Sequence, residues 1–251
     1  MAADPSSSPP PSTREAPKPK GARLGTRLRG RLADAYDSRG HHRSNLWYVY
    51  SPKARVDVVL RSDVEFGHFL LVESDANIVH VDYSPEKRIA SIAGEEYGTI
   101  VDAELTLRDG TRVWREVKSS EDVEQGAQTR ANLQLMVQMK AAAFAGVSHE
   151  LITDKQVFAQ PQRIHNWLRI VAWLSQARFH PLEHYTRAVL KIIKTRGEVR
   201  LADIAALGPD TEIGLFCAAA FQLVQQGLVA SDLDVLALTL QSRFFLMGEA
   251  A

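Results

Sequence analysis

The pattern of hydrophobic and polar positions divides the chain into a mixed part, up to about residue 177, and a mainly helical part after it. In the mixed part, apolar residues at helical spacing predict helices over 63–74, 127–145 and 164–177. Alternating or β-branched segments between them predict five strands, over 78–83, 87–92, 98–107, 111–118 and 149–153. Helices and strands in this order are typical of an α/β domain with a mixed sheet flanked by helices.

The pattern changes at Arg178-Phe179-His180-Pro181, where we place a domain boundary. Three short helices are predicted beyond it, over 184–195, 201–207 and 212–226. Residues 228–231 and 235–245 then alternate as in a β-hairpin. This order is typical of a small winged-helix-like domain, which usually binds DNA or docks a protein. A helical cap that only completes the core is the alternative.

Asp102 and the triplet Glu116-Val117-Lys118 lie on the two strands that flank a predicted hairpin turn. Glu116 and Lys118 point to the same face, since side chains of a strand alternate. A two-residue turn at Asp109-Gly110 would place Asp102 opposite Val117, on the wrong face. A three-residue loop, Arg108-Asp109-Gly110 with Gly110 in the left-handed region, sets Asp102 directly across from Glu116. We expect the second register because this loop prefers glycine at its third position.

That register would bring two carboxylates and an ammonium group together. Two such carboxylates repel each other unless a cation lies between them, and a hard divalent ion such as Mg²⁺ suits their oxygens. Lys118 could then orient or activate the attacking water and stabilise charge on a phosphodiester. Taken alone, an E-x-K triplet at the end of a strand usually forms a solvated ion pair, and that interpretation stays open here.

Positive charge is concentrated at the N-terminus of the chain. Residues 1–50 carry nine basic and four acidic side chains, so this segment has a charge of +5 and the remainder −5. The Pro- and Ser-rich residues 1–21 are expected to be disordered. Residues 22–61 are interpreted as a basic arm and lead-in, whose arginines could contact DNA phosphates; they are Arg23, Arg27, Arg29 and Arg31. A solubilising tail is the alternative.

Composition narrows the remaining possibilities. The chain has 251 residues and one cysteine, Cys217, which excludes a disulfide framework and a thiolate-rich zinc site. Its histidines lack zinc-ligand spacing, and no phosphate-binding loop of the G-x-x-x-x-G-K-[ST] type is present. Without a long apolar run or a secretory signal pattern, we expect a soluble cytoplasmic protein with no membrane association.

The arrangement of Asp102 with Glu116-Val117-Lys118 resembles the D…(D/E)xK signature of restriction-endonuclease-like nucleases. The wider pattern is similar to the TnsA family, the endonuclease subunit of heteromeric transposases. The run over 64–75 resembles a helix motif of that family, and Gly146, 150–153 and Asn166 resemble the tail of its catalytic domain. The resemblance covers about residues 43–175. The chain has Val101 and Ser84 where the family often has proline and glutamine.

The resemblance implies a restriction-endonuclease-like nuclease domain over 62–177 and a winged-helix-like domain over 178–251. It implies Glu65 as a catalytic carboxylate on the helix, Asp102 and Glu116 as ligands of Mg²⁺, with Mn²⁺ as a substitute, and Lys118 as the catalytic lysine. The expected activity is hydrolysis of DNA at the 5′ ends of a mobile element. Expected partners are DNA, a DDE-type transposase subunit and an ATPase regulator of transposition. A stand-alone restriction or repair nuclease, and an inactive DNA-binding adaptor, are the alternatives.

Overall fold

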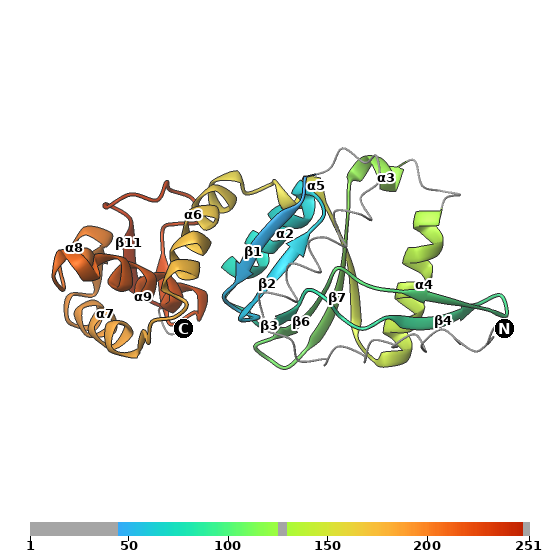
Figure 1. Ribbon diagram of the computed structural model, residues 1–251, viewed down its shortest axis with the longest axis horizontal. Helices are drawn as coiled ribbons and strands as arrows, with labels where there is room; N and C mark the ends of the chain where they lie inside the picture. Colours follow the sequence, from blue (N-terminus) through green and yellow to red (C-terminus); the bar gives the residue numbers. More distant parts are fainter. Residues whose placement is uncertain (1–44, 125–129, 248–251) are drawn as a thin grey trace, which may run out of the picture.

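The structure is a computed structural model that describes residues 45–124 and 130–247. The predicted disordered tail and the four arginines of the basic arm lie outside these residues. Figure 1 shows an elongated molecule with a sheet-containing part and a smaller, mainly helical part, joined through α6 (Pro161–Ala177). No helix within the described ranges is long and apolar enough to cross a membrane.

A four-stranded sheet forms the centre of the first part. Its order is β3 (Ile78–Asp82), β6 (Ala103–Leu107), β7 (Arg112–Lys118) and β8 (Ser148–Thr153). The first three strands are antiparallel neighbours, and β8 runs parallel to β7, so the predicted mixed sheet is confirmed.

Two helices cover opposite faces of this sheet. Val72 of α2 (Asp63–Ser74) packs with Leu105 and Val113 on one face. Ala141 and Ala142 of α4 (Arg130–Ala145) pack with Trp114 on the other face. Because side chains alternate along β7, Glu116 and Lys118 share the α4 face with Trp114. The helix-flanked sheet therefore determines which residues can meet at the end of β7.

A hairpin that was not predicted precedes α2. It consists of β1 (Trp47–Ser51) and β2 (Val56–Leu60), within the segment that the sequence interpretation treated as a lead-in. Its aromatic and β-branched residues favour strands. Trp47 stacks on Phe66 of α2 with ring centroids 4.1 Å apart, and Leu60 joins the core. The described part of the lead-in is thus folded structure.

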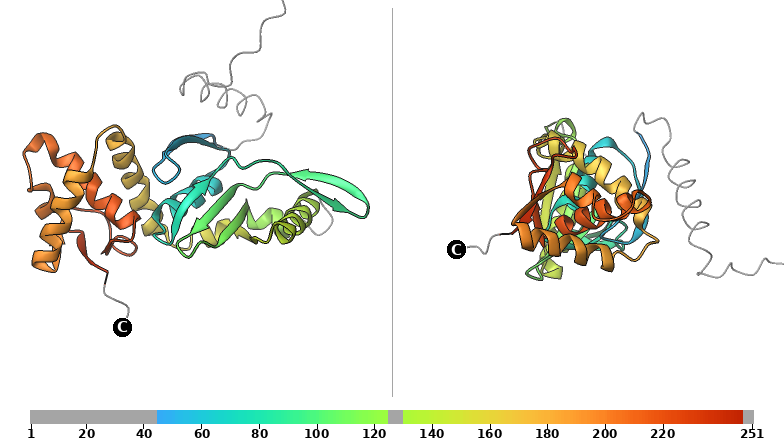
Figure 2. Two further views of the ribbon diagram at one scale, coloured as in Figure 1. Left: turned by 90° about the horizontal axis from the view of Figure 1, so that it is seen from below. Right: turned by 90° about the vertical axis from the view of Figure 1, so that its left-hand side faces the viewer.

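The predicted strand over 98–107 is wrong as one element. Residues Glu95–Thr99 form β5, which pairs with β4 (Arg88–Ile92), whereas β6 begins at Ala103. The turn between β4 and β5 has positive φ at Ala93 (53°) and Gly94 (89°). Figure 2 shows this hairpin projecting beyond the sheet. Residues 100–102 connect two different sheets, so Asp102 lies just before β6 instead of inside a strand.

Short elements connect the main ones. They are α3 (Ser120–Glu124), α5 (Asp154–Val157) and η1 (Asp210–Glu212), none of which was predicted. The predicted helix over 127–145 is observed as α4 from Arg130, since 125–129 lie outside the described residues. The predicted start of α6 at 164 is three residues late, because Pro161 occupies the first turn, where its missing N–H costs nothing.

We call residues 178–247 the C-terminal unit. It contains three helices and a three-stranded sheet in the order β10-β11-β9. The helices are α7 (Glu183–Arg196), α8 (Leu201–Ala205) and α9 (Ile213–Gln225). The strands are β9 (Glu198–Arg200), β10 (Val229–Ser231) and β11 (Arg243–Leu246).

The predicted strand over 235–245 is wrong for most of its length, because 232–242 form a loop that is tied to α6. The side-chain amide of Asn166 donates to the carbonyl oxygens of Leu233 (2.6 Å) and Leu236 (2.7 Å). Its oxygen accepts from the backbone N–H of Leu238 at 2.9 Å. Backbone groups engaged in this way are not free to pair in a sheet. One continuous hydrophobic cluster runs from Leu60 through Trp167 to Phe244, so the core crosses the predicted boundary at 178.

Candidate active site

Glu65 lies in the first turn of α2. Ser62 caps the helix, and its side-chain oxygen accepts from the backbone N–H of Glu65 at 3.1 Å. The Glu65 carboxylate in turn accepts from the backbone N–H of Arg61 at 2.8 Å. Burial raises the pKa of Glu65, while the hydrogen bonds that its carboxylate accepts from the Arg61 N–H and the Ser62 hydroxyl, together with the charges of Arg61 and Lys118, oppose the shift. The capping interaction thus fixes a partly desolvated carboxylate at the helix N-terminus.

The β6–β7 hairpin has the register that the three-residue loop predicts. The backbone N–H of Leu107 donates to the carbonyl of Thr111 at 2.8 Å, and Gly110 has a φ of 86°. Ala103 pairs with Arg115, and the N–H of Asp102 donates to the carbonyl of Arg115 at 3.0 Å. Asp102 therefore lies across from Glu116, and the prediction of this register is confirmed.

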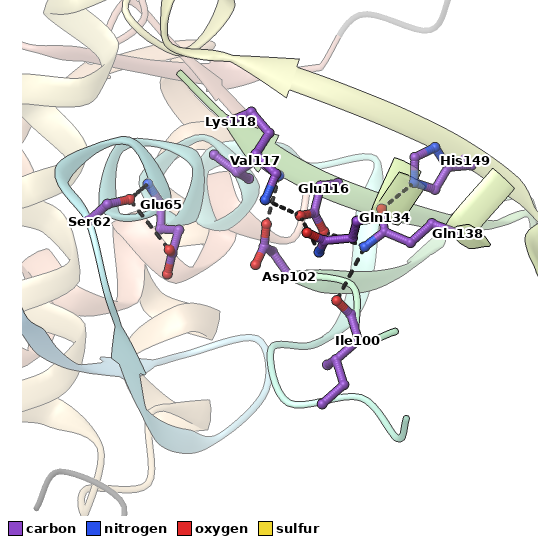
Figure 3. Close-up of polar contacts among 10 residues, drawn as sticks. All are labelled: Ser62, Glu65, Ile100, Asp102, Glu116, Val117, Lys118, Gln134, Gln138 and His149. Atoms are coloured by element: carbon purple, nitrogen blue, oxygen red, sulfur yellow. Dashed lines mark hydrogen bonds and ion pairs between the residues drawn. The ribbon is translucent and has the colours of Figure 1, made fainter. Parts of the chain in front are cut away.

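The Asp102 side chain turns toward the end of β7. One of its carboxylate oxygens accepts from the backbone N–H of Val117 at 2.7 Å. Figure 3 shows Asp102 between Glu65 of α2 and Glu116 of β7. Burial and the charges of Glu116 and Glu65 raise the pKa of Asp102 to about 8, against the opposing effects of the Val117 N–H and Lys118. Glu65 and Glu116 are thus close enough to affect the protonation of Asp102.

Glu116 is only 1% exposed and is held from two sides. Its Oε1 accepts from the Lys118 ammonium at 2.6 Å and from the amide of Gln134 at 2.9 Å. Its Oε2 accepts from the amide of Gln138 at 2.6 Å. Burial opposes the charged form of Lys118, but the hydrogen bond and charge of Glu116, with the charges of Asp102 and Glu65, raise its pKa. Lys118 is therefore a cation at neutral pH.

The glutamines of α4 were missed by the sequence interpretation. Gln134 and Gln138 are four residues apart and so lie on one face of the helix, toward Glu116. Gln138 is fully buried; its amide also donates to the carbonyl of Ile100 at 3.2 Å, and its oxygen lies 3.1 Å from Nε2 of His149. The sequence signal that could have identified them is the spacing of two glutamines on one face of a helix that is expected to flank the sheet.

A cavity of about 540 Å³ opens beside Glu65 and Asp102. Its lining includes Glu65, Asp102 and Val117, together with Arg61 and His68. His68 is 4% exposed, its Nε2 has no hydrogen-bond partner, and burial with the charge of Arg115 lowers its pKa to about 3. The cavity thus has carboxylates on one part of its wall and a neutral imidazole on another.

We use the name site cluster for Glu65, Asp102, Glu116 and Lys118, the four residues predicted from the sequence. The structure brings all four into one electrostatically coupled group. Glu73, another carboxylate of the run over 64–75, is not part of it; it is fully buried and accepts a hydrogen bond from Ser51. The predicted DNA-contacting arginines of the arm lie outside the described residues.

Comparisons of the chain with protein-family models and with curated proteins give no match. The function of the chain must therefore be inferred from its own residues.

The oxygen-rich donor set of the site cluster fits a hard divalent cation. Among the described residues, no group of three or more His, Cys, Asp or Glu side chains is arranged to hold a metal ion. Asp102 and Glu116, however, are adjacent carboxylates, and burial, followed by repulsion from the charge of Glu116, raises the pKa of Asp102. A cation bound by these two residues and by water would relieve that repulsion, and Mg²⁺ commonly binds through one or two carboxylates.

Proposed function

We propose that this chain is a Mg²⁺-dependent DNA endonuclease of the restriction-endonuclease-like type, acting as a TnsA-like subunit of a heteromeric transposase. The observation that carries the proposal is the position of Asp102 across from Glu116, with Lys118 ion-paired to Glu116 and Glu65 close by. Two carboxylates that can hold a metal ion and a lysine that can stabilise phosphate charge are groups that metal-assisted phosphodiester hydrolysis can use. The sheet order and helix-flanked faces supply rigid support for them.

In this proposal, Asp102 and Glu116 hold Mg²⁺, with Mn²⁺ as a substitute, and the ion supplies Lewis-acid activation of the scissile phosphate and of water. Lys118 stays protonated because its pKa is raised, so it stabilises negative charge on the phosphate and orients the water instead of removing a proton. Glu65, whose pKa is raised, is placed to accept a proton or position the water from the cavity side.

The transposition role rests on the resemblance to the TnsA family. The chain would cut the 5′ ends of a mobile element, and a DDE-type transposase subunit would cut and join the 3′ ends. The helices and three-stranded sheet of the C-terminal unit are compatible with a winged-helix-like domain. We propose that this unit docks the transposase or an ATPase regulator of transposition.

Nicking of supercoiled plasmid DNA by the full chain tests the proposal. The reactions contain Mg²⁺ or Mn²⁺, and the partner transposase is added if the chain alone does not cut DNA. Asp102→Ala and Lys118→Ala are each expected to reduce nicking at least about a thousandfold. The matched controls are Asp210→Ala and Lys155→Ala, which remove an exposed aspartate and an exposed lysine that are not part of the site cluster. Full nicking by either site variant would refute the assignment.

A DNA-binding adaptor without catalysis is the second candidate, and one observation favours it. Lys118, Gln134 and Gln138 already engage both oxygens of Glu116, and the described residues offer no metal-binding group of three or more. Titration calorimetry with Mn²⁺ separates the two functions. Binding that is lost in Asp102→Ala supports the nuclease, whereas DNA binding without any cation binding supports the adaptor. Sequence-preferring cleavage by the isolated chain would instead indicate a stand-alone nuclease.

A further inference from the structure

The exposed face of α7 carries a row of basic side chains. Arg187, Lys191 and Lys194 are separated by four and three residues, so they lie on one face of the helix. All three are exposed, and the exposed His184 extends the row by one turn toward the helix N-terminus. We use the name α7 stripe for Arg187, Lys191 and Lys194. The stripe spans roughly 10 Å along the helix axis, at 1.5 Å per residue.

The opposite face of α7 fixes the orientation of this row. Val189 and Ile193 are completely buried in the main hydrophobic cluster, and Ala188 and Ile192 pack against it. The helix cannot rotate about its axis without exposing these side chains to water. The α7 stripe is therefore held toward solvent as a preformed row of charges.

No carboxylate within the described ranges forms an ion pair with the α7 stripe; Arg187 donates instead to the backbone carbonyl of Glu183 at 3.1 Å. Two other exposed arginines of the C-terminal unit do have such partners: Arg196 pairs with Asp203 at 3.4 Å and Arg243 with Glu198 at 3.6 Å.

The sequence of the C-terminal unit holds seven basic and seven acidic side chains. The net charge of the C-terminal unit is therefore zero, and the α7 stripe is a local concentration of positive charge. A row of cations without internal partners attracts an external anion.

Two other surfaces of the C-terminal unit are unsuited to DNA. In winged-helix proteins the third helix commonly enters the groove, but the corresponding α9 has no charged residue and exposes only Gly214 along its length. The loop over 232–242 carries Asp232 and Asp234 and exposes Val235 and Leu236. Its aspartates would repel phosphates. The α7 stripe, unlike these two surfaces, is complementary to a polyanion.

We infer that the α7 stripe binds the phosphate backbone of duplex DNA, so that the C-terminal unit contacts DNA through its first helix and without reading the sequence. The inference rests on DNA being the substrate in the proposed function. A straight row of three cations suits the regularly spaced phosphates of a duplex. Figure 1 places α7 in the part of the molecule beyond α6, away from the β4–β5 hairpin. The stripe would therefore hold DNA that flanks the cleavage point.

The test measures binding of a fluorescein-labelled 30-base-pair duplex to the full chain by anisotropy, without divalent metal and over a range of NaCl concentrations. The variant Arg187→Ala/Lys191→Ala/Lys194→Ala is expected to weaken binding about tenfold or more. The slope of log affinity against log salt should fall by about 2 to 3, at about 0.9 per phosphate contact.

The matched control is Lys155→Ala/Arg196→Ala/Arg243→Ala, which removes three exposed cations that already have carboxylate partners. It should change affinity less than about twofold, and unchanged thermal unfolding shows that both triple variants are folded.

Equal affinity and slope for the stripe variant and the wild type would overturn the inference. Loss of binding to a fluorescent poly-glutamate peptide with unchanged duplex binding would also overturn it, in favour of an acidic protein partner. Equal losses in the stripe variant and its control would show a general charge effect and would overturn it as well. Because no metal is present and no site residue is changed, these outcomes are independent of whether the chain cleaves DNA.

Discussion

Two buried carboxylates of this molecule, Glu73 and Glu116, have different surroundings. Glu73 is fully buried and receives hydrogen bonds from the hydroxyl of Ser51 (2.5 Å), the backbone N–H of Lys53 (3.2 Å), the hydroxyl of Tyr83 (3.3 Å) and the amide of Gln225 (2.8 Å). We call these five residues the Glu73 cluster. The donors belong to β1, to the turn after β1, to the residue that follows β3, and to α9. Because α9 is part of the C-terminal unit, the Glu73 cluster connects this unit to α2.

Glu116 is as deeply buried but has a second carboxylate beside it. Asp102 is near enough to interact with it electrostatically, Lys118 pairs with it, and a cavity lined by Asp102 and Glu65 borders the group. The Glu73 cluster also contains the ionisable Lys53 and Tyr83, but Glu73 is its one carboxylate, and protein donors occupy its oxygens. Burial alone therefore does not distinguish a functional acid from a structural one; a second carboxylate beside the first does.

The largest expected effect that separates the two clusters is on stability. Glu73→Ala removes the side-chain acceptor for Ser51, Lys53 and Gln225, and Gln225 keeps only the backbone carbonyl of residue 73, so the free energy of unfolding should fall by about 3 kcal/mol. Asp102→Asn removes repulsion between neighbouring carboxylates and should leave the free energy of unfolding unchanged or higher. Urea unfolding followed by circular dichroism measures both. A stable Glu73→Ala protein would show that the Glu73 cluster does not hold the molecule together.

Local chemistry explains what the sequence could predict. The register of the β6–β7 hairpin follows from Gly110, because a three-residue loop needs a left-handed residue at that point, and this register places Asp102 across from Glu116. The boundaries of α2 follow from the Ser62 cap and a run of apolar residues. Features that depend on a few adjacent residues were therefore within reach of the sequence.

Features set by tertiary contacts were not. Gln138 resembles any polar helix residue until the packing of α4 against the sheet buries it beside Glu116. The apolar alternation over 235–245 favours a strand, but Asn166, some seventy positions earlier, binds the backbone of that loop. The separation of β5 from β6 likewise depends on which sheet each half joins. Such choices are made between elements, and no local pattern encodes them.

A smaller effect concerns the hydrogen bonds that hold Glu116. Gln138→Leu keeps the side-chain volume but removes the donor to Glu116 and to the carbonyl of Ile100, so Glu116 loses its fixed orientation. Nicking should fall about 10- to 100-fold, and the affinity for Mn²⁺ by calorimetry should fall in parallel.

Gln134→Leu should have a weaker effect, because Lys118 donates to the same oxygen of Glu116. Unfolding measurements on both variants control for stability. Unchanged nicking and Mn²⁺ affinity in Gln138→Leu would show that α4 supports the fold without positioning the site.

The smallest expected effect is in the pH dependence of stability, and it separates the two clusters by their pKa values. Burial raises the pKa of Glu73 to about 7, opposed by its hydrogen bonds and Lys53, whereas an unfolded glutamate titrates near 4.5. Between these values the folded chain keeps a proton that the unfolded chain has lost, so the contribution of Glu73 to the free energy of unfolding falls as pH rises. The wild type minus Glu73→Gln difference should therefore fall by about 1 kcal/mol between pH 6 and pH 7 and level off above pH 7. Because the pKa of Asp102 is raised to about 8, the wild type minus Asp102→Asn difference should continue to fall up to pH 8. Urea unfolding at half-unit pH steps measures both differences, and curves that level off at the same pH would show that the two acids experience equivalent environments.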